Sequence, residues 1–110
     1  MNNSVIKSKK IEEFIDEHIT EELSLDIIAE NFEMSRHHLC HLFKKNMGCT
    51  VLQYIKHKRL CFVKNCYISG LNLLDAAKLA GFKSYSSFYR AYYSEFGKSP
   101  SKDIDSSENK

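Results

Sequence analysis

The sequence predicts an all-α protein of seven helices, and three observations support this. The 110 residues include only four glycines and one proline, so long stretches are free to be helical. Apolar residues recur at spacings of three and four, whereas strict apolar and polar alternation, the pattern of strands, is nearly absent. Serine, threonine or asparagine precedes most of the apolar stretches, as expected for helix N-caps, and glycine follows several of them.

Most of the predicted helices begin directly after a candidate capping residue. The longest of them opens with a T-x-x-Q capping box formed by Thr50 and Gln53. Its 17 residues would be ~25 Å long at the usual rise of an α-helix. A last, short helix is expected to start at Pro100, because proline after serine favours a first helical position. The other predicted segments are 8–20, 25–32, 36–47, 73–79 and 85–96, and the long one is 51–67.

An internal repeat organises these helices. With an offset of 48, Ala29 falls on Ala77, and with an offset of 49, Gly48 falls on Gly97. Each half consists of a short helix, a tight turn, a longer helix and a glycine, which is the order of a helix-turn-helix unit. The sequence therefore predicts an N-terminal helix-turn-helix subdomain over 1–50, a long linker helix over 51–68, a C-terminal helix-turn-helix subdomain over 69–104 and a disordered tail over 105–110.

Charge is strongly segregated along the chain. Residues 1–34 contain nine acidic and three basic residues, whereas residues 35–60 contain six basic residues and no acidic one. A basic side of this kind indicates a polyanionic partner, double-stranded nucleic acid above all. Chance clustering on a solvated surface is the alternative.

Other classes of protein find little support. No apolar run approaches the ~20 residues that span a bilayer, and the polar first ten residues do not resemble a signal peptide, so we expect a cytoplasmic protein without membrane contact. The four cysteines form no C-x-x-C pair and are expected to be free thiols. There is no glycine-rich phosphate loop and no paired carboxylates at a catalytic spacing, so neither an enzyme nor a cofactor is predicted.

In a helix-turn-helix unit the second helix enters the major groove, and its exposed residues meet base edges. Helical spacing turns Leu39, Leu42 and Phe43 inward in the first unit, and Phe88 and Tyr92 in the second. The exposed residues are then Arg36, His37, His38, Cys40, His41 and Lys44 in the first unit, and Tyr85, Ser86, Tyr89, Arg90 and Tyr93 in the second.

Arg90 is the best single candidate for reading a base, because its planar guanidinium matches O6 and N7 of guanine. A phosphate contact or a surface ion pair is the alternative for this side chain. Lysines after the recognition-helix start and hydroxyls at helix starts suit phosphate oxygens, although such hydroxyls also serve as plain caps. The candidate phosphate-contacting residues are Ser35, Arg36, Lys44, Lys45, Thr50, Lys83, Ser84 and Tyr85.

Three segments of the chain resemble the DNA-binding domain of AraC/XylS-type transcriptional regulators. They read SLDIIAENFEMSRHHLCHLFKKNMG, YIKHKRL and AAKLAGFKSYSSFYRAYYSEFGKSP, and the resemblance covers about residues 9–101. It implies seven helices, two helix-turn-helix units joined by a long helix, and sequence-specific binding of double-stranded DNA in adjacent major-groove segments. The base-facing positions that it implies are His37, Cys40, His41, Ser86, Ser87, Tyr89 and Arg90.

Two departures from this pattern concern the turn and the charge of the recognition helix. Glu33 occupies the first turn, where glycine is common, and a left-handed residue other than glycine costs ~1 kcal/mol. Tyr93 and Ser94 replace the usual basic pair, which weakens the expected phosphate anchoring at that place.

Two further departures concern the second core. Ala76 and Ala80 are smaller than the usual residues, so that core is expected to be looser. Asp103 and Ile104 stand where an aromatic residue and an arginine are usual, so the last helix is expected to be short or frayed.

Two alternatives remain open. His37 and His41, with Cys40 beside them, could bind Zn²⁺ or Cu²⁺ in a metal- or redox-sensing helical protein, although spacing fixes no fourth ligand and we predict no metal site. A protein-interaction module is the other, and it predicts no salt-dependent affinity for DNA. Family members often carry a separate effector-binding domain, and the prediction leaves room for that domain and for RNA polymerase as further partners.

Overall fold

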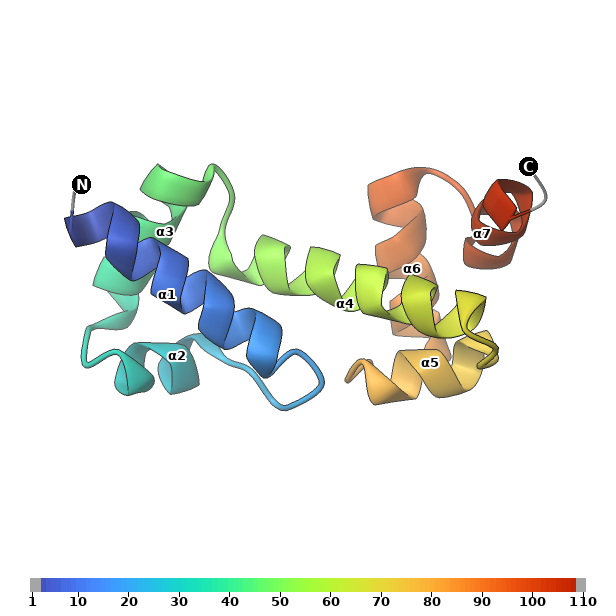
Figure 1. Cartoon of the computed structure of the whole chain (residues 1–110), viewed down its shortest axis with the longest axis horizontal. Helices are drawn as coiled ribbons and strands as arrows, with labels where there is room; N and C mark the ends of the chain where they lie inside the picture. The colour runs from blue at the N-terminus through green and yellow to red at the C-terminus, as the bar shows by residue number, and fades with distance from the viewer. Residues whose placement is uncertain (1–2, 109–110) are drawn as a thin grey trace. The chain divides into compact units, whose positions relative to one another are not determined.

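The structure is a computed structural model that describes the backbone of residues 3–108 and the side chains of residues 3–104. Within that range it is all-helical, which confirms the predicted fold class, and Figure 1 shows the order of the elements. The seven helices are α1 (Asn3–Glu17), α2 (Leu25–Asn31), α3 (Arg36–Met47), α4 (Val51–Ile68), α5 (Leu73–Leu79), α6 (Tyr85–Phe96) and α7 (Pro100–Glu108).

The predicted caps set most of the helix starts. In each of four caps a side-chain oxygen accepts the backbone N–H three residues downstream, at distances of 2.8 to 3.1 Å. These caps are Ser24, Ser35, Asn72 and Ser84. At the start of α4 the N–H of Thr50 donates to Oε1 of Gln53 at 2.9 Å, and the N–H of Gln53 donates to Oγ1 of Thr50 at 3.0 Å. This reciprocal pair confirms the capping box.

The chain divides into two compact units, and the boundary falls inside α4. Unit 1 comprises Met1–Ile55 and unit 2 comprises Lys56–Lys110. Helix α4 crosses this boundary, so its residues Val51–Ile55 belong to unit 1 and the rest of the helix belongs to unit 2. Each helix-turn-helix unit gains a piece of α4 that closes its core.

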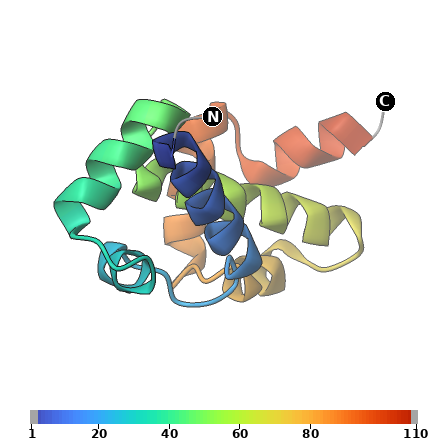
Figure 2. The same cartoon turned by 60° about the vertical axis from the view of Figure 1, so that its left-hand side comes forward.

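The core of unit 1 forms where α1 and α2 pack on α3. Ile11 and Ile15 of α1 are fully buried together with Phe43 of α3, and Val51 and Ile55 add the first turns of α4. Figure 2 shows the chain turning sharply between α2 and α3.

Glu33 adopts a left-handed conformation with φ of 53° in this turn, which confirms the prediction made from its position. The N–H of the next residue, Met34, donates to the carbonyl of Ala29 and closes the turn.

Unit 2 has its own core around the aromatic residues of α6. Phe88 and Tyr92 are fully buried against Leu60 and Val63 of α4, and Ile104 of α7 closes the other side. The small alanines of α5 are buried as well, so α5 can approach α4 and α6 closely.

The first helix begins earlier and ends earlier than predicted. Ser8 is buried, and its hydroxyl accepts a hydrogen bond of 2.8 Å from Nδ2 of Asn46, which also donates to the carbonyl of Ser4 at 3.0 Å. These bonds hold the first turns of α1 against α3. At the other end, Nδ1 of His18 lies 2.8 Å from the carbonyl oxygen of Phe14, where it caps the last turn.

The last helix is longer than predicted. Helix α7 runs from Pro100 to Glu108, beyond the point at 105 where a disordered tail was expected to begin, whereas residues 109–110 of that tail lie outside the described residues. The expectation of a short or frayed helix is corrected for a physical reason. Ile104 is fully buried in the second core, and the hydroxyl of Tyr92 donates to the carboxylate of Asp103 at 2.6 Å.

Gly81, which ends the α5 segment, gives a first testable consequence. Its φ is +95°, and a Cβ at this position would lie 3.3 Å from Cζ of the half-buried Arg59. Gly81→Ala should therefore lower the free energy of unfolding by about 1–3 kcal/mol, combining backbone strain with displacement of the guanidinium. Urea unfolding measures this loss.

Gly97→Ala is the matched control for this substitution. Gly97 also has a positive φ, of 73°, but a Cβ there would meet nothing within 4 Å. Its loss should therefore be smaller than that of Gly81→Ala. Equal losses for the two variants would show that the contact with Arg59 contributes nothing.

A second consequence concerns alkaline pH. Burial, and next the hydrogen bond to Asp103, raise the pKa of Tyr92, while burial and the hydrogen bond to Asp16 raise the pKa of Tyr54. The folded state therefore favours the neutral phenols. This stabilisation is complete below the ordinary tyrosine pKa of about 10 and is lost as the pH rises above it.

Urea unfolding between about pH 8 and 11 tests this expectation, because it spans the ordinary pKa of tyrosine. Tyr92→Phe should show a weaker loss of stability over this range, whereas Tyr93→Phe, which removes an exposed phenol, should behave as the wild type does. Identical pH profiles for all three proteins would contradict the assignment.

Candidate nucleic-acid interface

Helix α3 presents one apolar and one polar face. Its cap, Ser35, fixes the start of the helix, and Leu39, Leu42 and Phe43 are buried as predicted. The predicted base-contacting residues of this unit, His37, Cys40 and His41, are all exposed. The imidazole rings of His37 and His41 stack with centroids 6.4 Å apart and planes 15° from parallel. The outer face of α3 thus offers adjacent ring nitrogens that can donate or accept hydrogen bonds.

The candidate phosphate-contacting residues of unit 1 differ in their exposure and in the contacts that they already make within the chain. Lys44 and Lys45 are exposed in the last turns of α3. Arg36 is exposed too, and its Nε lies 3.4 Å from a carboxylate oxygen of Asp26 on α2. Thr50 is half-buried and its hydroxyl accepts the N–H of Gln53, so its capping role is established by the contacts.

Helix α6 repeats this division into two faces. Phe88 and Tyr92 are buried, whereas the candidate residues Tyr85, Ser86, Tyr89 and Arg90 are exposed and line one shallow hollow. A second hollow, lined by Tyr89, Arg90, Tyr93 and Ser94, continues along the helix. Arg90 therefore lines both hollows on the outer surface of α6.

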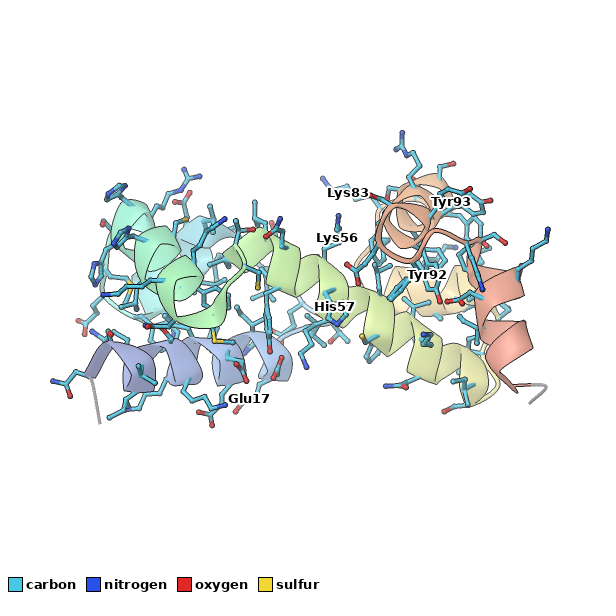
Figure 3. All side chains as sticks on the ribbon, turned by 90° about the horizontal axis from the view of Figure 1, so that it is seen from above. Glu17, Lys56, His57, Lys83, Tyr92 and Tyr93 are labelled. Carbon is cyan, nitrogen blue, oxygen red and sulfur yellow. The ribbon has the colours of Figure 1, made fainter. Side chains whose placement is uncertain are left out.

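Two neighbouring tyrosines of α6 have opposite environments, which fixes the orientation of the helix in its unit. Tyr92 lies on the side of α6 toward α4, and Tyr93 lies on its outer side (Figure 3). The ring of Tyr93 stacks on that of Tyr89, with centroids 6.3 Å apart and planes 17° from parallel. The outer side of α6 thus carries a stacked aromatic pair beside Arg90.

The start of α6 contains three more candidates. Lys83 and Ser84 are exposed, and the Ser84 hydroxyl accepts the N–H of Ser87 at 3.1 Å. Ser87 itself is half-buried, and its hydroxyl donates to the carbonyl of Ser84 at 3.3 Å. The structure therefore turns Ser87 back into the cap, away from the outward row formed by Ser86, Tyr89 and Arg90.

Sequence analysis missed an ion pair that ties α4 to α6. Nδ1 of His57 pairs with the carboxylate of Glu95, and Nε2 of His57 lies 3.5 Å from Sγ of Cys61. Lys64 lies over the ring of Phe96, 5.0 Å from its centroid. His57 and Lys64 are far from Glu95 and Phe96 in the sequence, and only the packing of α6 on α4 brings them together.

The described part of the chain shows no metal cluster, disulfide or membrane-spanning helix. Over residues 3–104, no group of three histidine, cysteine or carboxylate side chains is arranged to hold a metal ion. All four cysteines are free, Cys40 being exposed and the others half-buried. Among the described helices, none combines the length and the apolar character that crossing a bilayer requires.

Comparison with known families identifies this arrangement of helices. The family described as "Helix-turn-helix domain", whose helix-turn-helix is of the AraC type, matches residues 28–104. The chain belongs to the AraC/XylS family. The match begins in α2 and ends in α7, so it includes α3 and α6.

Two curated relatives show the similarity in sequence. The chain is 32% identical over 83 residues to the probable transcription factor PqrA of Proteus vulgaris, covering 74% of this chain and 68% of that protein. It is 33% identical over 89 residues to the HTH-type transcriptional activator AarP of Providencia stuartii, covering 80% of this chain and 66% of that protein. The chain thus spans about two thirds of the length of each.

The fold is that of a DNA-binding domain solved together with DNA. The DNA-binding domain of AdpA, a global transcriptional factor, was crystallised in complex with a target DNA. It superposes with a TM-score of 0.83 at 20% identity and covers 90% of either chain.

Proposed function

We propose that this AraC/XylS-family chain binds double-stranded DNA in a sequence-specific manner and regulates transcription. The observation that carries the proposal is the repeated division of α3 and α6 into two faces. Each helix buries large apolar side chains on one face and exposes hydrogen-bonding side chains on the other. Such a face can enter the major groove without exposing apolar core residues.

The exposed residues supply the chemistry for reading bases. His37, Cys40 and His41 of α3 would meet base edges in one groove segment, and Ser86, Tyr89 and Arg90 of α6 in another. Arginine is the donor that best matches guanine, and each good bidentate contact contributes about 1–3 kcal/mol of discrimination against a wrong base. The half-buried Ser87 is the weakest of the predicted base contacts.

The phosphate contacts would fix the register of each helix on the duplex. Lys44 and Lys45 in unit 1, and Lys83 with the exposed cap Ser84 in unit 2, are placed at or near the ends of the recognition helices. Arg36 must exchange its partner Asp26 for a phosphate, and Tyr85 contributes a hydroxyl at the first position of α6. Thr50 contributes through the N–H groups at the start of α4.

Both units would bind one duplex. Helix α4 has 18 residues, a length of ~27 Å at the usual helical rise, and successive major grooves on one face of B-DNA repeat every ~34 Å. A monomer could then read a bipartite site without two-fold symmetry. A regulator of this kind acts in the cytoplasm, with RNA polymerase as a protein partner and an effector-binding domain as a source of control.

Selection of bound duplexes from a random pool, followed by affinity measurements on the selected and a scrambled duplex, tests this proposal. We expect a preference for the selected duplex, and a logarithm of affinity that falls with the logarithm of salt concentration by about 0.9 per phosphate contacted. The same affinity for both duplexes, together with no salt dependence, would instead support a module that binds other proteins.

A further inference from the structure

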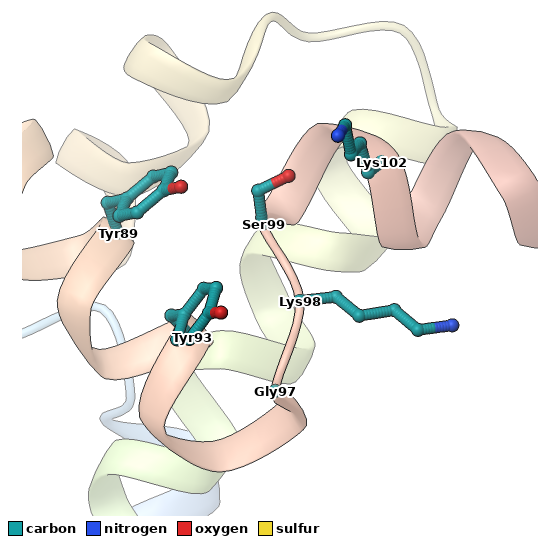
Figure 4. A pocket seen from close by; sticks show the side chains of 6 residues that line it. All are labelled: Tyr89, Tyr93, Gly97, Lys98, Ser99 and Lys102. Atoms are coloured by element: carbon teal, nitrogen blue, oxygen red, sulfur yellow. The ribbon is translucent and has the colours of Figure 1, made fainter.

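The outer surface of α6 borders a third hollow, which leads away from Arg90 toward α7. Tyr89, Tyr93, Gly97, Lys98, Ser99 and Lys102 line it (Figure 4). The stacked rings of Tyr89 and Tyr93 form a wall that this lysine hollow shares with the hollow beside Arg90. One aromatic pair therefore separates the candidate base-reading surface from a surface that carries two lysines.

The chemistry of the lysine hollow favours an anion. Its lining residues include two lysines, two tyrosines and one serine, and they include no aspartate or glutamate. Tyr89 and Tyr93 are 40% and 53% exposed, so both residues lie at the surface. Figure 4 shows both hydroxyls directed toward the loop that carries Lys98 and Ser99. Lysine and hydroxyl donors together are the usual partners of phosphate oxygens.

The lysine hollow lies next to the surface proposed to read bases, so a phosphate of the DNA backbone is the ligand that we expect there. A helix lying in a major groove about 12 Å wide has a phosphate backbone on each side. The usual basic pair of α6 is replaced by Tyr93 and Ser94, so α6 itself has no basic residue in its last turn. Lys98 and Lys102 place positive charge on the adjoining loop and on α7 instead.

We infer that the lysine hollow binds one phosphodiester of the DNA backbone beside the groove that α6 reads. The inference rests on the proposed function and deepens it, because it adds α7 and the preceding loop to the DNA-binding surface. Lys98 and Lys102 provide the charge, while the hydroxyls of Tyr93 and Ser99 donate to the phosphate oxygens. None of Lys98, Ser99 and Lys102 belongs to the residues expected from the sequence to contact DNA.

The first test removes the charge of the lysine hollow. The double variant Lys98→Ala/Lys102→Ala is expected to bind the selected duplex about three- to tenfold more weakly at 0.2 M salt, with a salt slope reduced by about 0.9. The matched control, Lys7→Ala/Lys10→Ala, removes the same charge from exposed positions of α1 and should leave the slope unchanged. Thermal unfolding confirms that both variants are folded.

The second test locates the phosphate. Selected duplexes that carry a neutral methylphosphonate at one position at a time should reveal a position on one strand where the wild type loses affinity. The Lys98→Ala/Lys102→Ala variant should no longer respond at that position, and Tyr93→Phe should respond less. Unchanged affinity, slope and phosphate map in the double variant would overturn this inference alone. A wild type without any salt-dependent DNA affinity would overturn the proposed function and the lysine hollow with it.

Discussion

Phe88→Ala should destabilise the chain by about 3–5 kcal/mol, the loss typical of a phenylalanine truncated inside a core. Phe88 is fully buried, and its ring meets those of Phe82 and Tyr85 with centroid separations of 5.5 Å each. The ring of Tyr92 follows at 6.0 Å. Because the alanines of α5 supply little volume, these neighbours cannot fill the space that the missing ring leaves. A loss of this size is a large fraction of the stability of a small domain, which is about 5–15 kcal/mol.

Urea unfolding followed by circular dichroism measures this loss. Phe88→Leu, which keeps the site apolar, should cost less than the alanine variant because it removes less volume. Leu74→Ala, at an exposed position of α5, provides the control for loss of an apolar side chain from the surface and should change little. A loss below about 1 kcal/mol for Phe88→Ala would show that α6 is not anchored by its aromatic core.

Arg90→Ala should reduce the preference for the selected duplex by about tenfold to a hundredfold, the equivalent of one bidentate base contact. Arg90 is exposed in the concave surface between Tyr85, Tyr89 and Tyr93, where its fork can reach a base edge. Binding to the scrambled duplex should fall much less, because a contact to a base edge is lost only where that base is present.

Lys44→Ala is the matched comparison for Arg90→Ala, since it also removes one exposed cation from a recognition helix. It should weaken binding to the selected and the scrambled duplex alike, and reduce the salt slope by about 0.9. Competition binding at several salt concentrations measures both variants. Equal losses on the two duplexes for Arg90→Ala would assign its side chain to a phosphate instead of a base.

Local signals in the sequence were sufficient for most of the fold. The caps Ser35 and Ser84, and the capping box at Thr50, bond only to residues three positions away, so their roles can be recognised without knowing the tertiary structure. The two-faced character of α3 and α6 follows from helical spacing in the same way. These are the elements that the sequence predicted with correct bounds or nearly so.

Helix α7 and the ends of α1 depended on distant partners. Asp103 looked unfavourable for the last helix, yet it accepts the hydroxyl of Tyr92, and Ile104 fills the second core. Likewise, Asn46 holds Ser8 from 38 residues away. Contacts of this kind form only when the helices pack, so no local pattern in the sequence predicts them.

The candidate site also has a part that local sequence patterns predicted and a part that depends on contacts between distant residues. Periodicity identified the exposed rows of α3 and α6, but could not show that the Ser87 hydroxyl turns back to the Ser84 carbonyl. The lysine hollow was missed because its walls come from α6, from the following loop and from α7. Only the folded structure brings Lys98 and Lys102 into one hollow with Tyr93, so the sequence alone could not identify them as a candidate site.

The most direct test of the central claim is a map of backbone amide NMR signals of the chain with and without the selected duplex. If α3 and α6 are the recognition helices, the largest changes should fall on residues 35–45 and 83–93, and they should saturate together at one duplex per chain. Changes confined to α1, or changes in one of the two helices only, would contradict binding of DNA by both units.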